Sequence, residues 1–246
     1  MSGPGEVSPS ANVLEQRLLE SLLTRGDLSR TLEIGSGDGR LLIPLALRSS
    51  HSVGIDVDFE RIRSLRARLV SQGIPAELIR ADGRRLPFSN GSFTTVLLVR
   101  LLHRFPEPVG VLREIRRIMT ERGTLLLSAV TRPSLRTLSW DFSASIGTSR
   151  TTDHVSFSRA EVAVVNSRTA PGYVMTRAGT VRALGSAGFE VVRTIASGWD
   201  LLPGFRSLSP PALLRLDSAL SHAPLAPTYF FAACPRQQIS RVVRSA

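Results

Sequence analysis

The sequence predicts an α/β fold in which a mostly parallel, seven-stranded sheet carries helices on both faces. Short apolar runs alternate with amphipathic segments from Arg30 onward, as in a sheet built from strand–helix units. The stretch TLEIGSGDGRLL (residues 31–42) places three glycines directly after the first apolar run. The run TTVLLV (residues 94–99) is apolar almost throughout, which is typical of a strand buried on both faces.

The elements before the middle of the chain follow from periodicity and capping residues. Leucines every four residues from Leu14 predict an N-terminal helix that ends near Gly26, with Asn12 and Glu15 as a capping box. Strands are expected at residues 30–34, 51–55, 76–80, 94–99 and 124–130. Helices are expected at residues 39–48, after Asp58 as N-cap, and at residues 108–119.

The alternation breaks after Val130. Residues 131–175 are rich in Ser, Thr and Arg, and a structureless stretch of that length is uncommon in a compact domain. We therefore expect a functional insertion with short helices of its own. The rest of the chain predicts a helix from Thr176 to Leu184, a strand at 188–196, a helix starting at Pro210 and a strand at 228–235.

We interpret the chain as a single domain, residues 1–246. Its expected parts are an N-terminal arm and helix (1–28), a ligand-binding core (29–130), a lid insertion (131–175), a segment that completes the sheet (176–235) and a basic tail (236–246).

The net charge of +11 allows two interpretations. All 31 basic residues are arginines, which suggests codon bias in a GC-rich genome. A positive surface can also attract nucleic acid, anionic lipid or an acidic substrate. Because the arginines are spread along the whole chain, a solvated basic surface is favoured over a dedicated polyanion site.

Other features of the composition narrow the class of protein. No apolar run reaches the roughly 18 residues of a membrane span, and the N-terminus has no secretion signal, so a cytoplasmic protein is expected. Cys234 is the single cysteine, which excludes an internal disulfide and a cysteine-rich zinc site.

The glycine-rich stretch predicts a ligand site between a strand and a helix. A dinucleotide-binding loop would need a third glycine at position 40, where Arg40 stands, and a phosphate loop would need a lysine, which the chain lacks. Glu33 lies two residues before Gly35 and is badly placed for a pyrophosphate. A carboxylate there suits a ligand with an ammonium or sulfonium group.

This pattern resembles the class I S-adenosylmethionine-dependent methyltransferases. The resemblance extends to VGIDVD (residues 53–58), RADGRRLPFSNGSF (80–93), LHRFPEP (102–108) and SAGFEVV (186–192), and it covers residues 12–235. The order and spacing of these motifs are those of the family. The resemblance implies a Rossmann-like, doubly wound sheet with an antiparallel last strand and S-adenosylmethionine as cofactor.

The resemblance also implies roles for single residues. Gly35 and Gly37 would lie against the cofactor, with Glu33 beside them, and Asp56 would accept hydrogen bonds from the ribose hydroxyls. Asp82 would meet the adenine amino group, with Gly83 next to it. Arg100 is a further candidate at the cofactor or at an anionic substrate, and His103 is a candidate general base.

Each role has a plainer alternative. Glu33 could be a polar residue at a strand end, and Asp82-Gly83 could be an ordinary turn. Asp56 could be a helix cap, although Asp58 is better placed for that. Gly39 could serve helix packing, and Arg100 could form a surface ion pair. His103 could cap a helix, and His154 on the insertion is a weaker candidate base.

The expected function is methyl transfer to a small organic acceptor by in-line displacement. Aromatic residues in the insertion suggest an acceptor with some apolar surface. One alternative is an RNA or other nucleic-acid methyltransferase, but VRLLHRF (residues 99–105) lacks the Asn/Asp-Pro-Pro-Tyr/Phe pattern of the amino-directed enzymes. A second alternative is a methyltransferase-like protein that binds the cofactor or a partner without catalysis.

Overall fold

The structure is a computed structural model that describes residues 20, 26–131, 162–166, 171–197, 210–220, 222, 223, 226 and 228–236. The N-terminal helix expected before Gly26 lies outside these residues except for the helical Glu20. The basic tail after Arg236 also lies outside them, as do His154 and much of the expected insertion.

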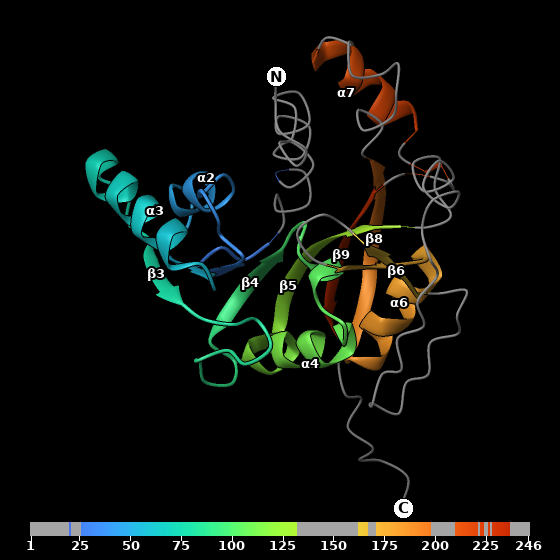
Figure 1. Cartoon of the computed structure of the whole chain (residues 1–246), viewed down its shortest axis with the longest axis horizontal. Helices are drawn as coiled ribbons and strands as arrows, with labels where there is room; N and C mark the ends of the chain where they lie inside the picture. The colour runs from blue at the N-terminus through green and yellow to red at the C-terminus, as the bar shows by residue number, and fades with distance from the viewer. Residues whose placement is uncertain are drawn as a thin grey trace, which may run out of the picture.

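A seven-stranded sheet with the order β3-β2-β1-β4-β5-β9-β8 forms the centre of the molecule (Figure 1). β9 pairs antiparallel with both β5 and β8, whereas the other pairs are parallel. This confirms the predicted Rossmann-like, mostly parallel sheet with an antiparallel last strand. Its strands are β1 (Arg30–Ile34), β2 (His51–Asp56), β3 (Glu77–Arg80), β4 (Phe93–Leu98), β5 (Met119–Val130), β8 (Phe189–Ser197) and β9 (Thr228–Pro235).

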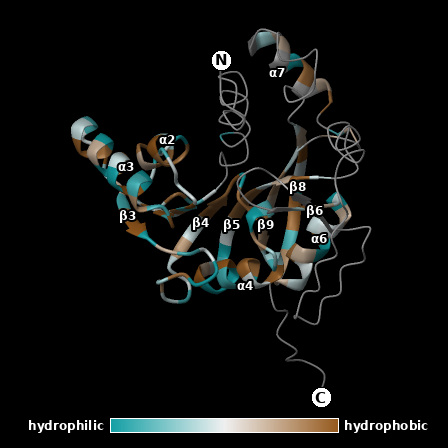
Figure 2. Ribbon diagram, viewed as in Figure 1, coloured by the Kyte–Doolittle hydropathy of each residue, from teal (hydrophilic) through white to brown (hydrophobic). Residues whose placement is uncertain are grey.

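Helices cover both faces of the sheet. The α-helices are α2 (Leu42–Ala46), α3 (Phe59–Gln72), α4 (Pro108–Ile118), α6 (Arg177–Ser186) and α7 (Pro210–Ala219). α4 and α6 share a core with Val96 and Leu98 of β4, while α2 packs with Leu97 and Val99 from the opposite face. The run TTVLLV is therefore buried on both faces, as its composition predicts, and Figure 2 shows the hydrophobic colouring of these central strands.

The first helix of the core is shorter than the periodicity predicts. Residues 39–48 were expected to be helical, but α2 has five residues, Leu42–Ala46. Gly39 still belongs to the preceding turn, with a φ of +79°. The last turn tightens, because the Arg48 amide donates to the carbonyl of Leu45 three residues earlier, at 3.0 Å.

The described parts of the insertion are strands, not the expected short helices. β6 (Val162–Asn166) and β7 (Pro171–Met175) pair antiparallel as a separate two-stranded sheet. β7 also forms a parallel bridge from Met175 to Thr131, directly after β5. The run VAVVN of β6 is rich in β-branched residues, which favours this strand structure.

Two predicted helix caps are confirmed. Asp58 accepts from the backbone amides of Glu60 and Arg61 at the start of α3, and Thr176 accepts from that of Gly179 at the start of α6. Within the described ranges, no helix has the length and apolar character needed to cross a membrane.

Two glycines with left-handed backbones allow a matched test of how the glycine loop packs on α3. A Cβ at Gly39 would overlap the buried Leu65, whereas a Cβ at Gly73, the C-cap of α3, would meet nothing within 4 Å. Gly73→Ala should lower the free energy of unfolding by about 1 kcal/mol through backbone strain alone. Gly39→Ala should lower it by about 2 kcal/mol or more, because crowding in the core adds to the strain. Urea unfolding of both variants measures the difference, and equal losses would contradict the assigned packing role of Gly39.

Candidate functional site

The candidate site lies where the order of the parallel strands reverses, between β1 and β4. Glu33 of β1 is in register with Gly54 of β2 and Leu97 of β4. Its side chain is buried at 5 % exposure near the carboxyl edge of the sheet. Open α/β sheets bind ligands outside this edge, at such a switch point.

The glycine loop begins directly after β1 and is held against β2. The amides of Gly35 and Ser36 both donate to the carbonyl of Ile55, at 2.8 and 2.9 Å. Gly35 and Gly37 have φ values of +79° and +52°. A Cβ at Gly35 would crowd Leu101 at 2.8 Å, whereas one at Gly37 would meet the end of the Arg61 side chain at 3.5 Å and the Gly35 carbonyl at 3.9 Å. Packing therefore explains the glycine at position 35, whereas at the buried Gly37 the positive φ favours glycine and a Cβ would make contacts of ordinary length.

Asp56 joins this loop to the end of β2. Its Oδ2 accepts from the Gly37 amide and its Oδ1 from the Asp58 amide, both at 3.0 Å. The helix-capping role belongs to Asp58, whose Oδ1 accepts from Glu60 and Arg61. Because a carboxylate has about four acceptor positions, the half-buried Asp56 can still accept from a ligand.

Asp82, expected at the adenine amino group, lies after β3 and pairs with Arg84. Nη2 of Arg84 lies 2.6 Å from Oδ2, and Nε lies 3.1 and 3.0 Å from Oδ1 and Oδ2. These hydrogen bonds hold the pKa of the Asp82 carboxyl below its ordinary value of 3.8, so the group stays ionised at neutral pH. An adenine amino group would have to share this carboxylate with Arg84 or displace it.

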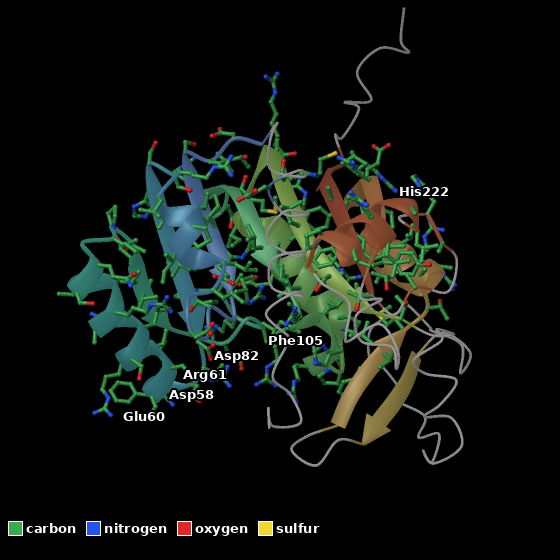
Figure 3. The ribbon with its side chains drawn as sticks, turned by 90° about the horizontal axis from the view of Figure 1, so that it is seen from above. Asp58, Glu60, Arg61, Asp82, Phe105 and His222 are labelled. Atoms are coloured by element: carbon green, nitrogen blue, oxygen red, sulfur yellow. The ribbon has the colours of Figure 1, made fainter. Side chains whose placement is uncertain are left out.

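Gly83 lies closely packed beneath this turn. A Cβ there would approach Ile34 and the ring of Phe105, each at 3.1 Å. Figure 3 shows Phe105, Asp82, Arg61 and Asp58 along one end of the sheet. The turn after β3 is thus close to the glycine loop, as the resemblance implies.

Arg100 follows β4 in a strained conformation. Its φ of +57° is in the left-handed region, which is uncommon for a residue other than glycine. The amide of Arg100 donates to Oγ of the buried Ser128 on β5 at 2.8 Å, and this bond fixes the turn. The next residue, Leu101, packs over Gly35. Strained backbones of this kind cluster at functional sites.

His103 lies half-buried in the short 3₁₀-helix η1 (Leu102–Arg104), directly after the Arg100 turn. η1 packs against both β5 and β7. A strand of the insertion therefore lies beside the candidate base, although the two are about 70 residues apart in sequence.

The structure thus brings the expected residues to one edge of the sheet, and their individual roles stay predictions. Sequence reasoning missed Ser128, Leu101 and Arg84. Ser128 alone carried a signal, as a polar residue inside the apolar run TLLLSAV. The contacts of Leu101 and Arg84 depend on the fold and on side-chain placement.

Comparisons with known proteins agree with this geometry. Residues 32–127 match the family model described as "Methyltransferase domain". The phthiotriol/phenolphthiotriol dimycocerosates methyltransferase of Mycobacterium leprae is 30% identical over 145 residues, which are 57% of this chain and 53% of that protein. The phosphatidylethanolamine N-methyltransferase of Cereibacter sphaeroides is 31% identical over 125 residues, 50% of this chain and 59% of that protein. The matches thus span little more than half of each relative.

The fold also matches solved structures. The PH0226 protein of Pyrococcus horikoshii superposes with a TM-score of 0.64 at 18% identity, covering 94% of this chain and 93% of that protein. This likeness concerns the fold alone. The match over residues 32–127, which contain the glycine loop, Asp56 and Asp82, shows that this part of the chain is similar to a methyltransferase domain.

Proposed function

We propose that this protein transfers a methyl group from S-adenosylmethionine to a small organic acceptor. The observation that carries the proposal is the Gly35–Gly39 loop. Its three glycines have positive φ values, and the Gly37 amide donates to Asp56 at 3.0 Å. Glycine at position 37 keeps this buried turn free of a side chain beside the Asp56 carboxylate, which suits a ligand that carries a diol and a positive charge.

The residues at the edge of the sheet fit this cofactor. Asp56 has acceptor capacity for two ribose hydroxyls, and Asp82 has a carboxylate for the adenine amino group. Ser36 is buried, and its Oγ forms no hydrogen bond with any residue that the structure describes. A bound ligand with a polar group would satisfy this hydroxyl, which is otherwise costly to bury. When bound, S-adenosylmethionine supplies a methyl group already activated by its sulfonium.

The protein then has to align the acceptor, exclude water and, for some acceptors, take a proton. The strained turn at Arg100 and the helix η1 form the acceptor side of the site in this proposal. His103 is the base for an acceptor that must lose a proton. β7 covers η1, and the insertion to which it belongs acts as the lid.

A small acceptor with apolar surface is favoured over nucleic acid. Several arginines form ion pairs with acids of the protein itself, including Arg61 with Asp58 and Arg84 with Asp82. These pairs compensate part of the positive charge locally, although the net charge stays at +11. One relative's name specifies a phospholipid, phosphatidylethanolamine, which supports an acceptor that combines a polar group with apolar chains.

Cofactor binding is tested by substituting Gly37, with Gly73 as a matched control. Both glycines have left-handed backbones, and a Cβ at either would meet no atom closer than 3.5 Å, but only Gly37 lies in the loop. Gly37→Val and Gly73→Val should both fold, with similar losses in stability from strain. S-adenosylhomocysteine at a hundred times its Kd should stabilise the wild type and Gly73→Val by about 2.7 kcal/mol, and Gly37→Val by close to nothing. Thermal unfolding with and without the ligand measures this stabilisation. Equal stabilisation of both variants would contradict the proposed cofactor site at Gly37.

The ribose role is tested by comparing Asp56→Ala with Asp58→Ala. Hydrogen bonds to a charged group contribute roughly 1.5–3 kcal/mol, so Asp56→Ala should weaken cofactor binding by at least about tenfold. Asp58→Ala should cost about 1 kcal/mol of stability, because α3 loses its cap, and should leave the affinity nearly unchanged. Calorimetric titration with the cofactor measures the affinity of both variants. If Asp58 controlled the affinity, the ribose assignment would be wrong.

The class of acceptor is tested with nucleic acids. Fluorescence anisotropy should show weak binding to duplex DNA and structured RNA, and the binding should collapse as salt rises, because it rests on sequence-independent phosphate contacts. Tight, salt-resistant binding to one RNA, with methyl transfer into it, would make the nucleic-acid alternative correct. A chain that binds the cofactor but transfers no methyl group to any acceptor would favour the non-catalytic alternative.

A further inference from the structure

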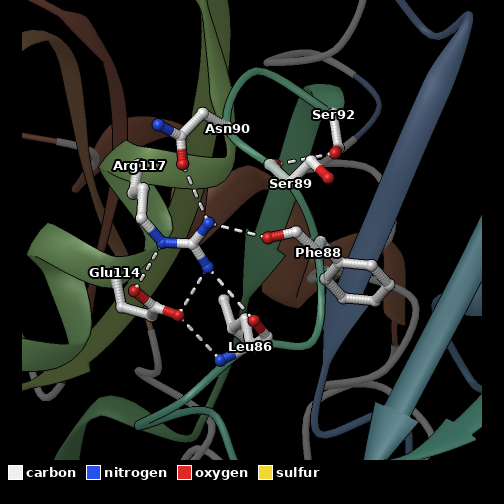
Figure 4. Close-up of polar contacts among 7 residues, drawn as sticks. All are labelled: Leu86, Phe88, Ser89, Asn90, Ser92, Glu114 and Arg117. Carbon is white, nitrogen blue, oxygen red and sulfur yellow. Dashed lines mark hydrogen bonds and ion pairs between the residues drawn. The ribbon is translucent and has the colours of Figure 1, made fainter.

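The loop after Asp82 is held by a side chain from a distant part of the chain. Arg117, in the last turn of α4, extends its guanidinium into residues 86–90 (Figure 4). Its Nη1 donates to the carbonyl of Phe88 at 2.7 Å and to Oδ1 of Asn90 at 3.0 Å. Its Nη2 donates to the carbonyl of Leu86 at 3.1 Å. One planar fork therefore fixes three acceptors of the loop.

Glu114, one turn earlier on α4, completes the contact. Its Oε1 accepts from the Leu86 amide at 2.8 Å and from Nη2 of Arg117 at 2.7 Å, and its Oε2 accepts from Nε of Arg117 at 2.9 Å. The side chains of Glu114 and Arg117 are 19% and 34% exposed. The hydrogen bonds from Arg117 hold the pKa of the Glu114 carboxyl below its ordinary value of 4.5. We call these two residues the α4 clamp.

The α4 clamp holds both peptide groups of Leu86, four residues after Asp82. Between them, the Arg85 amide donates to the Asp82 carbonyl at 3.0 Å and closes a tight turn. On the other side, Gly83 is packed against Ile34 and Phe105, and a Cβ there would approach each at 3.1 Å. The backbone that carries Asp82 is thus held by Gly83 on one side and by the α4 clamp on the other, while Arg84 holds the carboxylate itself.

We infer that Arg117 and Glu114 are positioning residues for the adenine end of the cofactor, acting through the segment from Asp82 to Leu86. The inference rests on the proposed function, since it takes Asp82 as the partner of the adenine amino group. Lysine cannot replace Arg117, because its point-like ammonium cannot bind the three acceptors and the carboxylate together.

The test compares binding of S-adenosylhomocysteine and S-inosylhomocysteine, which carries a carbonyl in place of the adenine amino group. The wild type should prefer the adenosyl compound by at least about tenfold, because the amino group donates to a carboxylate and the carbonyl cannot. Arg117→Met and Arg117→Lys should lose most of this preference, with the loss falling on the adenosyl compound. Calorimetry measures both affinities, and hydrogen exchange at the Leu86 amide should become faster in the same variants.

Arg116→Met is the matched control. Arg116 precedes Arg117 on α4 and forms an ion pair with Glu121, 2.7 Å away, outside the loop. The Arg116→Met variant should keep the wild-type preference for the adenosyl compound and the wild-type rate of hydrogen exchange at the Leu86 amide. Arg117 variants that weaken both ligands equally, or that keep the preference, would overturn the positioning role alone. A wild type that binds the adenosyl compound without preference would overturn the role of Asp82 and this inference with it, and one that binds neither compound would overturn the proposed function as well.

Discussion

The hydrogen bond from the Gly37 amide to Asp56 is the contact on which the rest of the site depends. It joins the loop that follows β1 to the end of β2, at 3.0 Å, and the second oxygen of the same carboxylate accepts from the Asp58 amide. One side chain thus fixes the shape of the glycine loop and the start of α3. Since the loop also donates twice to Ile55, its backbone is held in place before any ligand arrives. A loop ordered in advance loses less entropy on binding.

The other sides of the site are supported in the same way, by contacts from neighbouring elements. Ser128 on β5 holds the Arg100 turn, and that turn places Leu101 over Gly35. Arg117 on α4 holds the loop after β3. The strained or irregular segments lie at the carboxyl edge of the sheet, and regular, buried strands and helices support them. This division suits a site that needs positioned groups more than reactive side chains.

Most of the sheet and part of the site could be predicted from the sequence, because they depend on local patterns. The apolar run of β4, the Asp58 cap and the glycine spacing each act within a few residues. The length of α2 could not be predicted, because the turn at Gly39 continues into the expected helix. The pairing of β6 with β7 was missed because the composition of residues 131–175 suggested an insertion with short helices of its own. The Asp82–Arg84 pair and the contacts of Arg117 with residues 86–90 depend on side-chain placement and on packing between segments, which no local pattern encodes.

The most direct test of the account is a calorimetric titration of the unsubstituted chain with S-adenosylhomocysteine and, separately, with a nicotinamide dinucleotide. The geometry at Glu33, Gly37 and Asp56 predicts saturable binding of one S-adenosylhomocysteine per chain and no measurable binding of the dinucleotide. No heat with S-adenosylhomocysteine, together with clear binding of the dinucleotide, would contradict the assignment of this edge of the sheet to S-adenosylmethionine.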